Sequence, residues 1–226
     1  MKINALLKKS IAEFLGVLMF LSAIVAAVAN SGSDHMAAHA ALATTLGLAI
    51  LITAGVSGGH LNPAVSLYFY AKKALSLSEL GAYIAAQLAG ALVGAFIGAQ
   101  IVGKSISGFG TSSAAPSAAA IIGELFATGG LVFLVGYLAG NKLGNLIPAA
   151  VGLWVFAAAS FTITGAQANP AVSFGLSIVG QAIDFSAWIV IAQLAGGAIA
   201  MVFLQVFAAK PAKAVKSAKK AVAKKK

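Results

Sequence analysis

The pentapeptide Asn-Pro-Ala-Val-Ser occurs twice in this chain, as Asn62 to Ser66 and as Asn169 to Ser173. Asparagine favours the capping position before a helix, and proline favours the first helical turn, so each copy predicts a helix start at Pro63 or Pro170. The apolar stretches that follow, 62–70 and 169–179, are too short to cross a bilayer, since a helical span takes about 20 residues. Each copy therefore predicts a half-span.

Long apolar runs surround these two half-spans. Of the 226 residues 60% are hydrophobic and only 9% are charged, which is typical of a membrane protein and not of a soluble domain. Six runs have the length of a transmembrane helix, namely 6–29, 37–56, 79–102, 117–139, 145–164 and 184–209. The predicted fold class is all-α, with six transmembrane helices plus two re-entrant half-helices and no room for a second domain.

Other segments of the sequence are also duplicated. Residues 12–16 resemble 123–127, and residues 86–90 recur as 192–196. The chain is therefore predicted to consist of two repeats, about 6–102 and 117–209, within one domain at 1–209. Each repeat holds three spans, an odd number, so the second repeat must be inverted in the membrane and the half-spans enter from opposite faces.

The lysines indicate an orientation. All of the net charge of +10 comes from lysine, because the chain has no arginine. In the predicted topology Lys104 lies alone on one side, and the positive-inside rule then places both termini in the cytoplasm of a multi-pass protein of the plasma (inner) membrane. The opposite side holds Lys2, Lys8, Lys9, Lys72, Lys73, Lys142 and the eight lysines of the segment 210–226.

The segment 210–226 consists largely of lysine and alanine. It is predicted to be a disordered cytoplasmic tail. A lysine-rich tail directly after a last span more often contacts anionic lipid than nucleic acid, so we expect a lipid partner and no nucleic acid.

Several classes of function are disfavoured. The chain has no cysteine, so disulfides and thiolate metal sites are excluded, and its three scattered histidines predict no metal site. No catalytic constellation is visible, so we expect neither an enzyme nor a cofactor. The first 29 residues resemble a secretory signal peptide, but Glu13 inside the apolar run and its counterpart Glu124 favour a retained span.

The stretches before the asparagines, 57–61 and 164–168, are expected to be extended, so their backbone cannot satisfy itself in a helix. An extended, non-helical backbone at membrane depth survives only where it lines a cavity or is buried in protein. Candidate carbonyl acceptors along a pore are therefore those of Gly58, Gly59, His60, Leu61, Gly165, Ala166, Gln167 and Ala168. The positive ends of the half-helices would repel cations at the mid-plane, while the amides of Asn62 and Asn169 donate to a passing solute.

The stretches 57–65 and 164–171 resemble the two signature loops of the aquaporin and glycerol-facilitator family, and the likeness extends over about 11–207. The resemblance implies a homotetramer of passive channels for water and small uncharged solutes. Its motif residues are Asn62, Pro63, Ala64, Asn169, Pro170 and Ala171. It also implies that Glu13 and Glu124 support the loops, with a proton relay as the competing interpretation.

The sequence departs from the family pattern at the outer constriction. Val172 stands where members usually carry arginine, and an ungapped alignment places the other three positions at Leu42, Ala157 and Ala166. All four are apolar, which predicts a wide constriction that also passes glycerol, urea or metalloid hydroxides. A narrow, dewetted constriction that conducts poorly is the alternative, and with it a non-conducting structural protein.

Two further alternatives concern titratable groups. A proton-coupled transporter shares inverted repeats and broken helices, but it needs a titratable residue on the mid-plane path. No aspartate lies in the interior of a span, since Asp184 stands at the start of one. His60 invites a gating role, although a packed, hydrogen-bonded histidine is favoured. His35 and His39 are expected in an exposed loop.

Recurrent glycines are interpreted as helix-packing positions, namely Gly90, Gly94, Gly98, Gly196 and Gly197.

Overall fold

The computed structural model describes residues 4–32, 34–112 and 114–207, and all the regular secondary structure in them is helical. Six helices have the length and composition to span a membrane, which confirms the predicted count. The elements are α1 (Ala5–Ser31), α2 (His35–Ser57), α3 (Pro63–Ala71), α4 (Leu77–Ile101), α5 (Ala118–Gly140), the short 3-10 helix η1 (Gly144–Leu146), α6 (Ile147–Phe161), α7 (Pro170–Leu176) and α8 (Ile183–Phe207).

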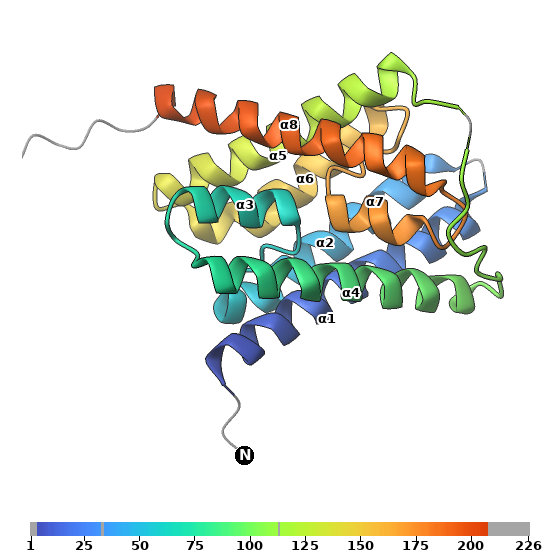
Figure 1. The fold of residues 1–226 in the computed structure, drawn as a ribbon, viewed down its shortest axis with the longest axis horizontal. Coiled ribbons are helices and arrows are strands. Elements are labelled where there is room, and N and C mark those ends of the chain that lie inside the picture. Colours follow the sequence, from blue (N-terminus) through green and yellow to red (C-terminus); the bar gives the residue numbers. More distant parts are fainter. Residues whose placement is uncertain (1–3, 33, 113, 208–226) are drawn as a thin grey trace, which may run out of the picture.

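The two short helices α3 and α7 begin at the prolines of the repeated motif. In Figure 1 they run from the middle of the molecule toward opposite ends, as expected for half-helices of inverted repeats. The second half-helix is shorter than predicted, because α7 ends at Leu176 and the chain continues in tight turns. There the N–H groups of Ile178 and Val179 bond carbonyls only three residues back, those of Gly175 and Leu176.

The helices pair in the same way in both repeats. In the first repeat α1 packs along α4, and in the second α5 packs along α8. Contacts of α2 with α6 and of α4 with α7 then join one repeat to the other. The two half-helices are thereby enclosed by the long helices, and the loops before them lie inside the molecule.

Glycines permit the close approach of the paired helices. A Cβ on Gly90 of α4 would lie 2.4 Å from the Phe14 carbonyl oxygen of α1, and a Cβ on Gly196 of α8 would lie 2.1 Å from that of Leu125 in α5. Both distances are far below contact, so no side chain fits at either position. Phe14 directly follows Glu13, and Leu125 directly follows Glu124, so the same contact occurs at equivalent positions of both repeats.

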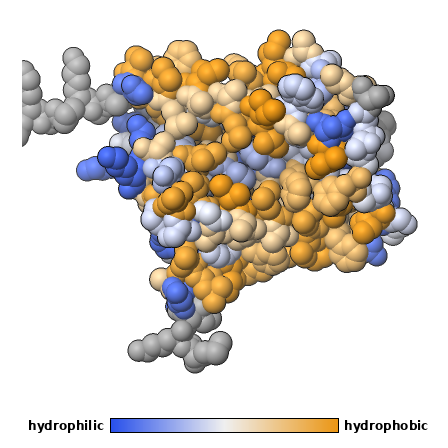
Figure 2. All heavy atoms as spheres, in the orientation of Figure 1, coloured by the Kyte–Doolittle hydropathy of each residue, from blue (hydrophilic) through white to orange (hydrophobic). Residues whose placement is uncertain are grey.

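The outer surface fits a lipid environment. Many large apolar side chains are exposed, such as Leu51 (61%), Leu153 (71%) and Val206 (78%). Figure 2 shows hydrophobic residues over most of the visible face, with hydrophilic residues gathered at its left and right ends. A belt of this kind is stable in a bilayer and would aggregate in water.

Part of the predicted organisation falls outside the described residues. The predicted tail at 210–226 and Lys2 lie there. The division of the chain at residue 209 stays a prediction.

The glycine contacts predict which substitutions destabilise the fold. Gly90→Ala and Gly196→Ala should each lower stability by about 1–3 kcal/mol, because a methyl group must displace a neighbouring backbone. Thermal unfolding of the detergent-solubilised protein measures this as a lower melting temperature. Gly81→Ala is the matched control, since it lies in the same helix as Gly90 and its added methyl would have no neighbouring side chain or helix within 4 Å. A Gly90→Ala protein as stable as Gly81→Ala would contradict the packing account.

Candidate functional site

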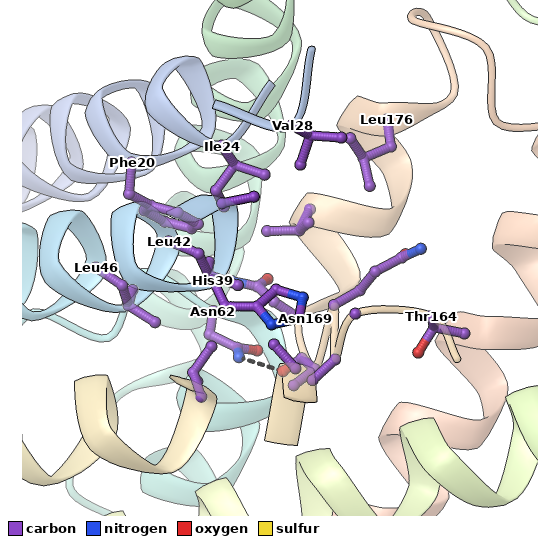
Figure 3. A pocket seen from close by; sticks show the side chains of 18 of the residues that line it. Phe20, Ile24, Val28, His39, Leu42, Leu46, Asn62, Thr164, Asn169 and Leu176 are labelled. Carbon is purple, nitrogen blue, oxygen red and sulfur yellow. Dashed lines mark hydrogen bonds between the residues drawn. The ribbon is translucent and has the colours of Figure 1, made fainter. Parts of the chain in front are cut away.

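Two asparagines join the half-helices at the centre of the molecule. The Oδ1 atoms of Asn62 and Asn169 each accept a hydrogen bond of 2.9 Å from the N–H two residues on, and so cap α3 and α7. The Nδ2 atom of each asparagine donates to the loop of the other repeat. Asn62 donates to the carbonyl of Ala168, and Asn169 donates to the carbonyl of Leu61, both at 2.8 Å. An amide nitrogen carries two hydrogens, so each asparagine keeps one donor for a further partner. Figure 3 shows both side chains at the cavity.

The loops before the asparagines are left-handed at equivalent positions. Residues four, three and one before each asparagine have positive φ. The values are 92°, 61° and 49° at Gly58, Gly59 and Leu61, and 70°, 49° and 47° at Gly165, Ala166 and Ala168. The predicted extended conformation is therefore wrong in detail, since the backbone is irregular. Each non-glycine residue held there costs about 1–2 kcal/mol, which other interactions must offset.

Glu13 on α1 supplies those interactions for the first loop. One carboxylate oxygen accepts from Ser57 Oγ at 2.6 Å and from the N–H of His60 at 3.0 Å. The other accepts from the N–H of Leu61 at 2.6 Å and from Gln87 Nε2 at 2.7 Å. The side chain is fully buried, yet four donors surround it, which is how an ionised carboxylate is tolerated away from water.

Glu124 on α5 holds the second loop with the same set of donors. One oxygen accepts from the hydroxyl of Thr164 and from the N–H of Gln167. The other accepts from the N–H of Ala168 and from Gln193 Nε2, both at 2.8 Å. Neither glutamate lines the cavity. This geometry favours the loop-supporting interpretation over a proton relay, which requires access to the path.

Two glutamines take part that sequence analysis did not assign. Gln87 Nε2 also donates to Ser66 Oγ on α3 at 3.0 Å, and Gln193 Nε2 donates to Ser173 Oγ on α7 at 2.9 Å. Each glutamine thus ties its glutamate to the half-helix as well as to the loop. The repeat of residues 86–90 at 192–196 contains both and was the available signal.

A cavity of about 790 Å³ passes the crossed asparagines. Both loops line it with all eight residues whose carbonyls were candidates, 58–61 and 165–168. The carbonyls of Leu61 and Ala168 already accept from the opposite asparagines. Of the predicted constriction, Leu42, Ala166 and Val172 line the cavity. The proline and alanine of each motif are buried in the half-helices, outside the lining.

Ala157 does not lie where the ungapped alignment put it. Its side chain is exposed on the outside of α6, and the residues of this helix that face the cavity include Val151, Val155 and Ala159. Two positions along an α-helix correspond to a rotation of about 200°, so Ala157 points away from the face that Val155 and Ala159 share. The prediction of Ala157 in the constriction is therefore wrong. On the face of α6 that lines the cavity, Ala159 is also small and apolar.

The three histidines differ from one another. His60 is buried in the first loop, with its ring stacked on Phe69 at 4.5 Å between centroids and Nδ1 3.2 Å from Ser66 Oγ. This packing favours a structural role. His35 and His39 are not loop residues as predicted: Asp34 caps α2, so both lie in its first turns and line the cavity.

Comparisons with known proteins agree with this geometry. The family model described as "Major intrinsic protein" matches residues 1–204. A "Probable aquaporin TIP-type" of Medicago truncatula is 33% identical over 76% of each chain, and "Aquaporin TIP1-1" of Arabidopsis thaliana is 32% identical over 89% of this chain and 87% of its own. Among solved structures, the aquaglyceroporin from Plasmodium falciparum shares the fold with a TM-score of 0.73 at 24% identity, over 88% of this chain and 95% of its own.

The donors around Glu124 predict a large effect of removing its charge. Glu124→Gln would turn an amide N–H₂ toward donors that now meet an oxygen, at a cost of about 3 kcal/mol or more. We expect a lower melting temperature and a loss of water permeability in proteoliposomes. Glu79→Gln is the control, because Glu79 forms a partly exposed ion pair with Lys9 at 2.7 Å, worth no more than about 1 kcal/mol. A Glu124→Gln protein of unchanged stability would instead favour the relay interpretation.

Proposed function

The chain belongs to the major intrinsic protein family, the family of the aquaporin channels, and on that premise we propose that its pore is wide and apolar at the outer constriction. Membership makes it an integral, multi-pass membrane protein and a passive channel for water and small neutral solutes, not an enzyme. The proposal concerns the solutes: we infer that glycerol, urea or metalloid hydroxides pass as well as water.

The observation that carries the proposal is the cavity-lining valine at position 172, directly after the second motif. We define the outer collar as the cavity-lining side chains of Leu42, Ala159, Ala166 and Val172. None of them carries a charge or a hydrogen-bond donor, and two are alanines. An arginine there would narrow the aperture and bind a solute through its five donors.

Polar groups near the collar favour an open pore over a dewetted one. Gln167 and Gln181 line the same cavity, and Gln167 Nε2 donates to Gln181 Oε1 at 2.6 Å. They give a solute hydroxyl alternative partners beside an otherwise apolar wall. Further along the path, Asn62 and Asn169 each retain one donor. A solute with several hydroxyls can therefore exchange its water partners for protein partners in sequence.

Charge exclusion is proposed to depend on the centre of the pore. The N-terminal ends of α3 and α7, with their partial positive charge, both face the crossed asparagines. A cation would meet this field from both half-helices, and the asparagines offer it donors only at their remaining N–H groups. Neutral solutes meet no such barrier.

We propose that the end of the molecule where α1 begins and α8 ends faces the cytoplasm of the plasma (inner) membrane. The described lysines at this end are Lys8, Lys9, Lys72, Lys73 and Lys142, and Lys104 follows α4 at the opposite end. A homotetramer is proposed from the family resemblance.

Val172→Arg tests the collar. The substitution should slow glycerol entry at least several-fold and slow water less, because the added side chain narrows the aperture for the larger solute. Stopped-flow light scattering on proteoliposomes measures both rates: the shrinkage of vesicles mixed with sucrose gives the water flow, and the reswelling of vesicles mixed with glycerol gives the glycerol entry. Glycerol entry into wild-type vesicles no faster than into empty ones would contradict the wide collar.

Two neighbours on α6 supply the matched control for this test. Ala159→Leu should slow glycerol as well, since Ala159 lines the cavity, whereas Ala157→Leu should leave both rates unchanged, since Ala157 is exposed on the outside. The reverse pattern would restore Ala157 to the constriction.

Single cysteines test the orientation cleanly, because the chain has none of its own. In right-side-out vesicles a membrane-impermeant maleimide should label Ser105→Cys and leave Lys72→Cys unlabelled until the membrane is opened. Both positions are exposed and lie at opposite ends of the molecule. Labelling of Lys72→Cys in sealed vesicles would reverse the proposed topology.

A further inference from the structure

His35 and His39 lie next to each other at one mouth of the cavity. They are four residues apart on α2, so their side chains share a face of the helix one turn apart. Their ring centroids are 6.4 Å apart and their planes are inclined by only 24°. Both residues line the cavity, and Figure 3 shows the His39 ring pointing into it.

Two imidazoles at this spacing can bind one metal ion. Imidazole nitrogen is a preferred ligand of Zn²⁺, Cu²⁺ and Ni²⁺. With metal–nitrogen bonds of about 2.0–2.1 Å, two rings that share an ion in tetrahedral or square geometry have centroids about 5 Å apart. The rings are stacked, so they must approach by about 1 Å and also turn until one nitrogen of each points at the ion, which rotation of the exposed His35 side chain allows.

The surroundings leave the binding nitrogens free. Nδ1 of His39 lies 3.5 Å from Ser160 Oγ, at the outer limit of a hydrogen bond, so Nε2 is the nitrogen left for a metal ion. A contact of this kind at the second nitrogen orients a metal-binding imidazole.

The local charges are nearly balanced. Asp34, directly before His35, accepts from the N–H of Ala37 at 3.1 Å, and its carboxylate offsets the positive end of α2. Lys104 lines the same cavity and opposes a cation. Binding therefore depends on the imidazole–metal bonds and not on a negative field, which favours transition metals over Ca²⁺ or Mg²⁺.

We propose that His35 and His39 form a transition-metal site at this mouth of the cavity, and that a bound ion obstructs the pore. Among the described residues no group of three histidine or carboxylate side chains gathers that could hold a metal. The ion thus has two protein ligands and completes its shell with water, so binding is reversible. Cu²⁺ binds most tightly in the usual order of affinities.

The binding part of the proposal is tested with Cu²⁺ on the full-length protein, purified without a histidine tag. Electron paramagnetic resonance of the bound ion should show coupling to two imidazole nitrogens. His35→Ala and His39→Ala should each reduce this to one nitrogen and weaken binding at least tenfold. Ser105→Ala, which lies at the same mouth without an imidazole, should leave the signal unchanged. An unchanged two-nitrogen signal in His39→Ala, or no bound ion at all, would overturn the site.

The obstruction is tested separately by stopped-flow water permeability of proteoliposomes. Cu²⁺ should slow wild-type water flow several-fold, a chelator should restore it, and both histidine variants should resist the ion. Undiminished water flow at copper concentrations that saturate the resonance signal would overturn the obstruction. Because the resonance signal does not require conduction, a failure of the site and a failure of the channel are distinguishable.

Discussion

The structure depends on satisfying the irregular backbone of two loops inside a bilayer. Segments that are left-handed at three positions cannot pair all of their own N–H groups, and lipid offers no partner. Glu13 and Glu124 provide the acceptors, each with four donors around a buried carboxylate. Each carboxylate is tolerated inside the protein because loop N–H groups donate to it, and each loop is held in place by the same hydrogen bonds. These bonds therefore fix the position of the loop residues that line the cavity.

The inverted repeat supplies this arrangement twice, and the asparagines connect the copies. Each donates to the carbonyl directly before the other, so neither loop can shift without breaking a bond to its counterpart. Gly90 and Gly196 bring the glutamate-bearing helices close to their glutamine-bearing partners, which lets Gln87 and Gln193 reach the carboxylates. The two repeats differ in detail: α7 is two residues shorter than α3, and the second repeat has no histidine to match His35 or His39.

The features that the sequence predicted are those with a local signal. Apolar runs fix the spans, the repeated motif fixes the half-helix starts, and a glutamate inside a span demands partners, so the six spans, Pro63, Pro170, Glu13 and Glu124 could be found by reading. The Ala157 assignment failed because a linear alignment says nothing of the rotation of α6, where two positions turn a side chain to the opposite face. His35 lies before the predicted run 37–56, and the cap at Asp34 extends α2 to include it, whereas the loop prediction for His39 disagreed with that run, which already contained it. The bridging role of Gln87 and Gln193 depends on contacts across the fold, which spacing alone does not reveal.

The central claim is that this pore excludes charge at the crossed asparagines and needs no arginine at its outer collar. The most direct test is a paired measurement on the same wild-type proteoliposomes, with water flow followed by light scattering and proton flow by an enclosed pH-sensitive dye. The account predicts water flow well above that of empty vesicles and proton flow equal to theirs. Proton flow that rises together with water flow would contradict it, because the half-helices would then be insufficient to exclude charge.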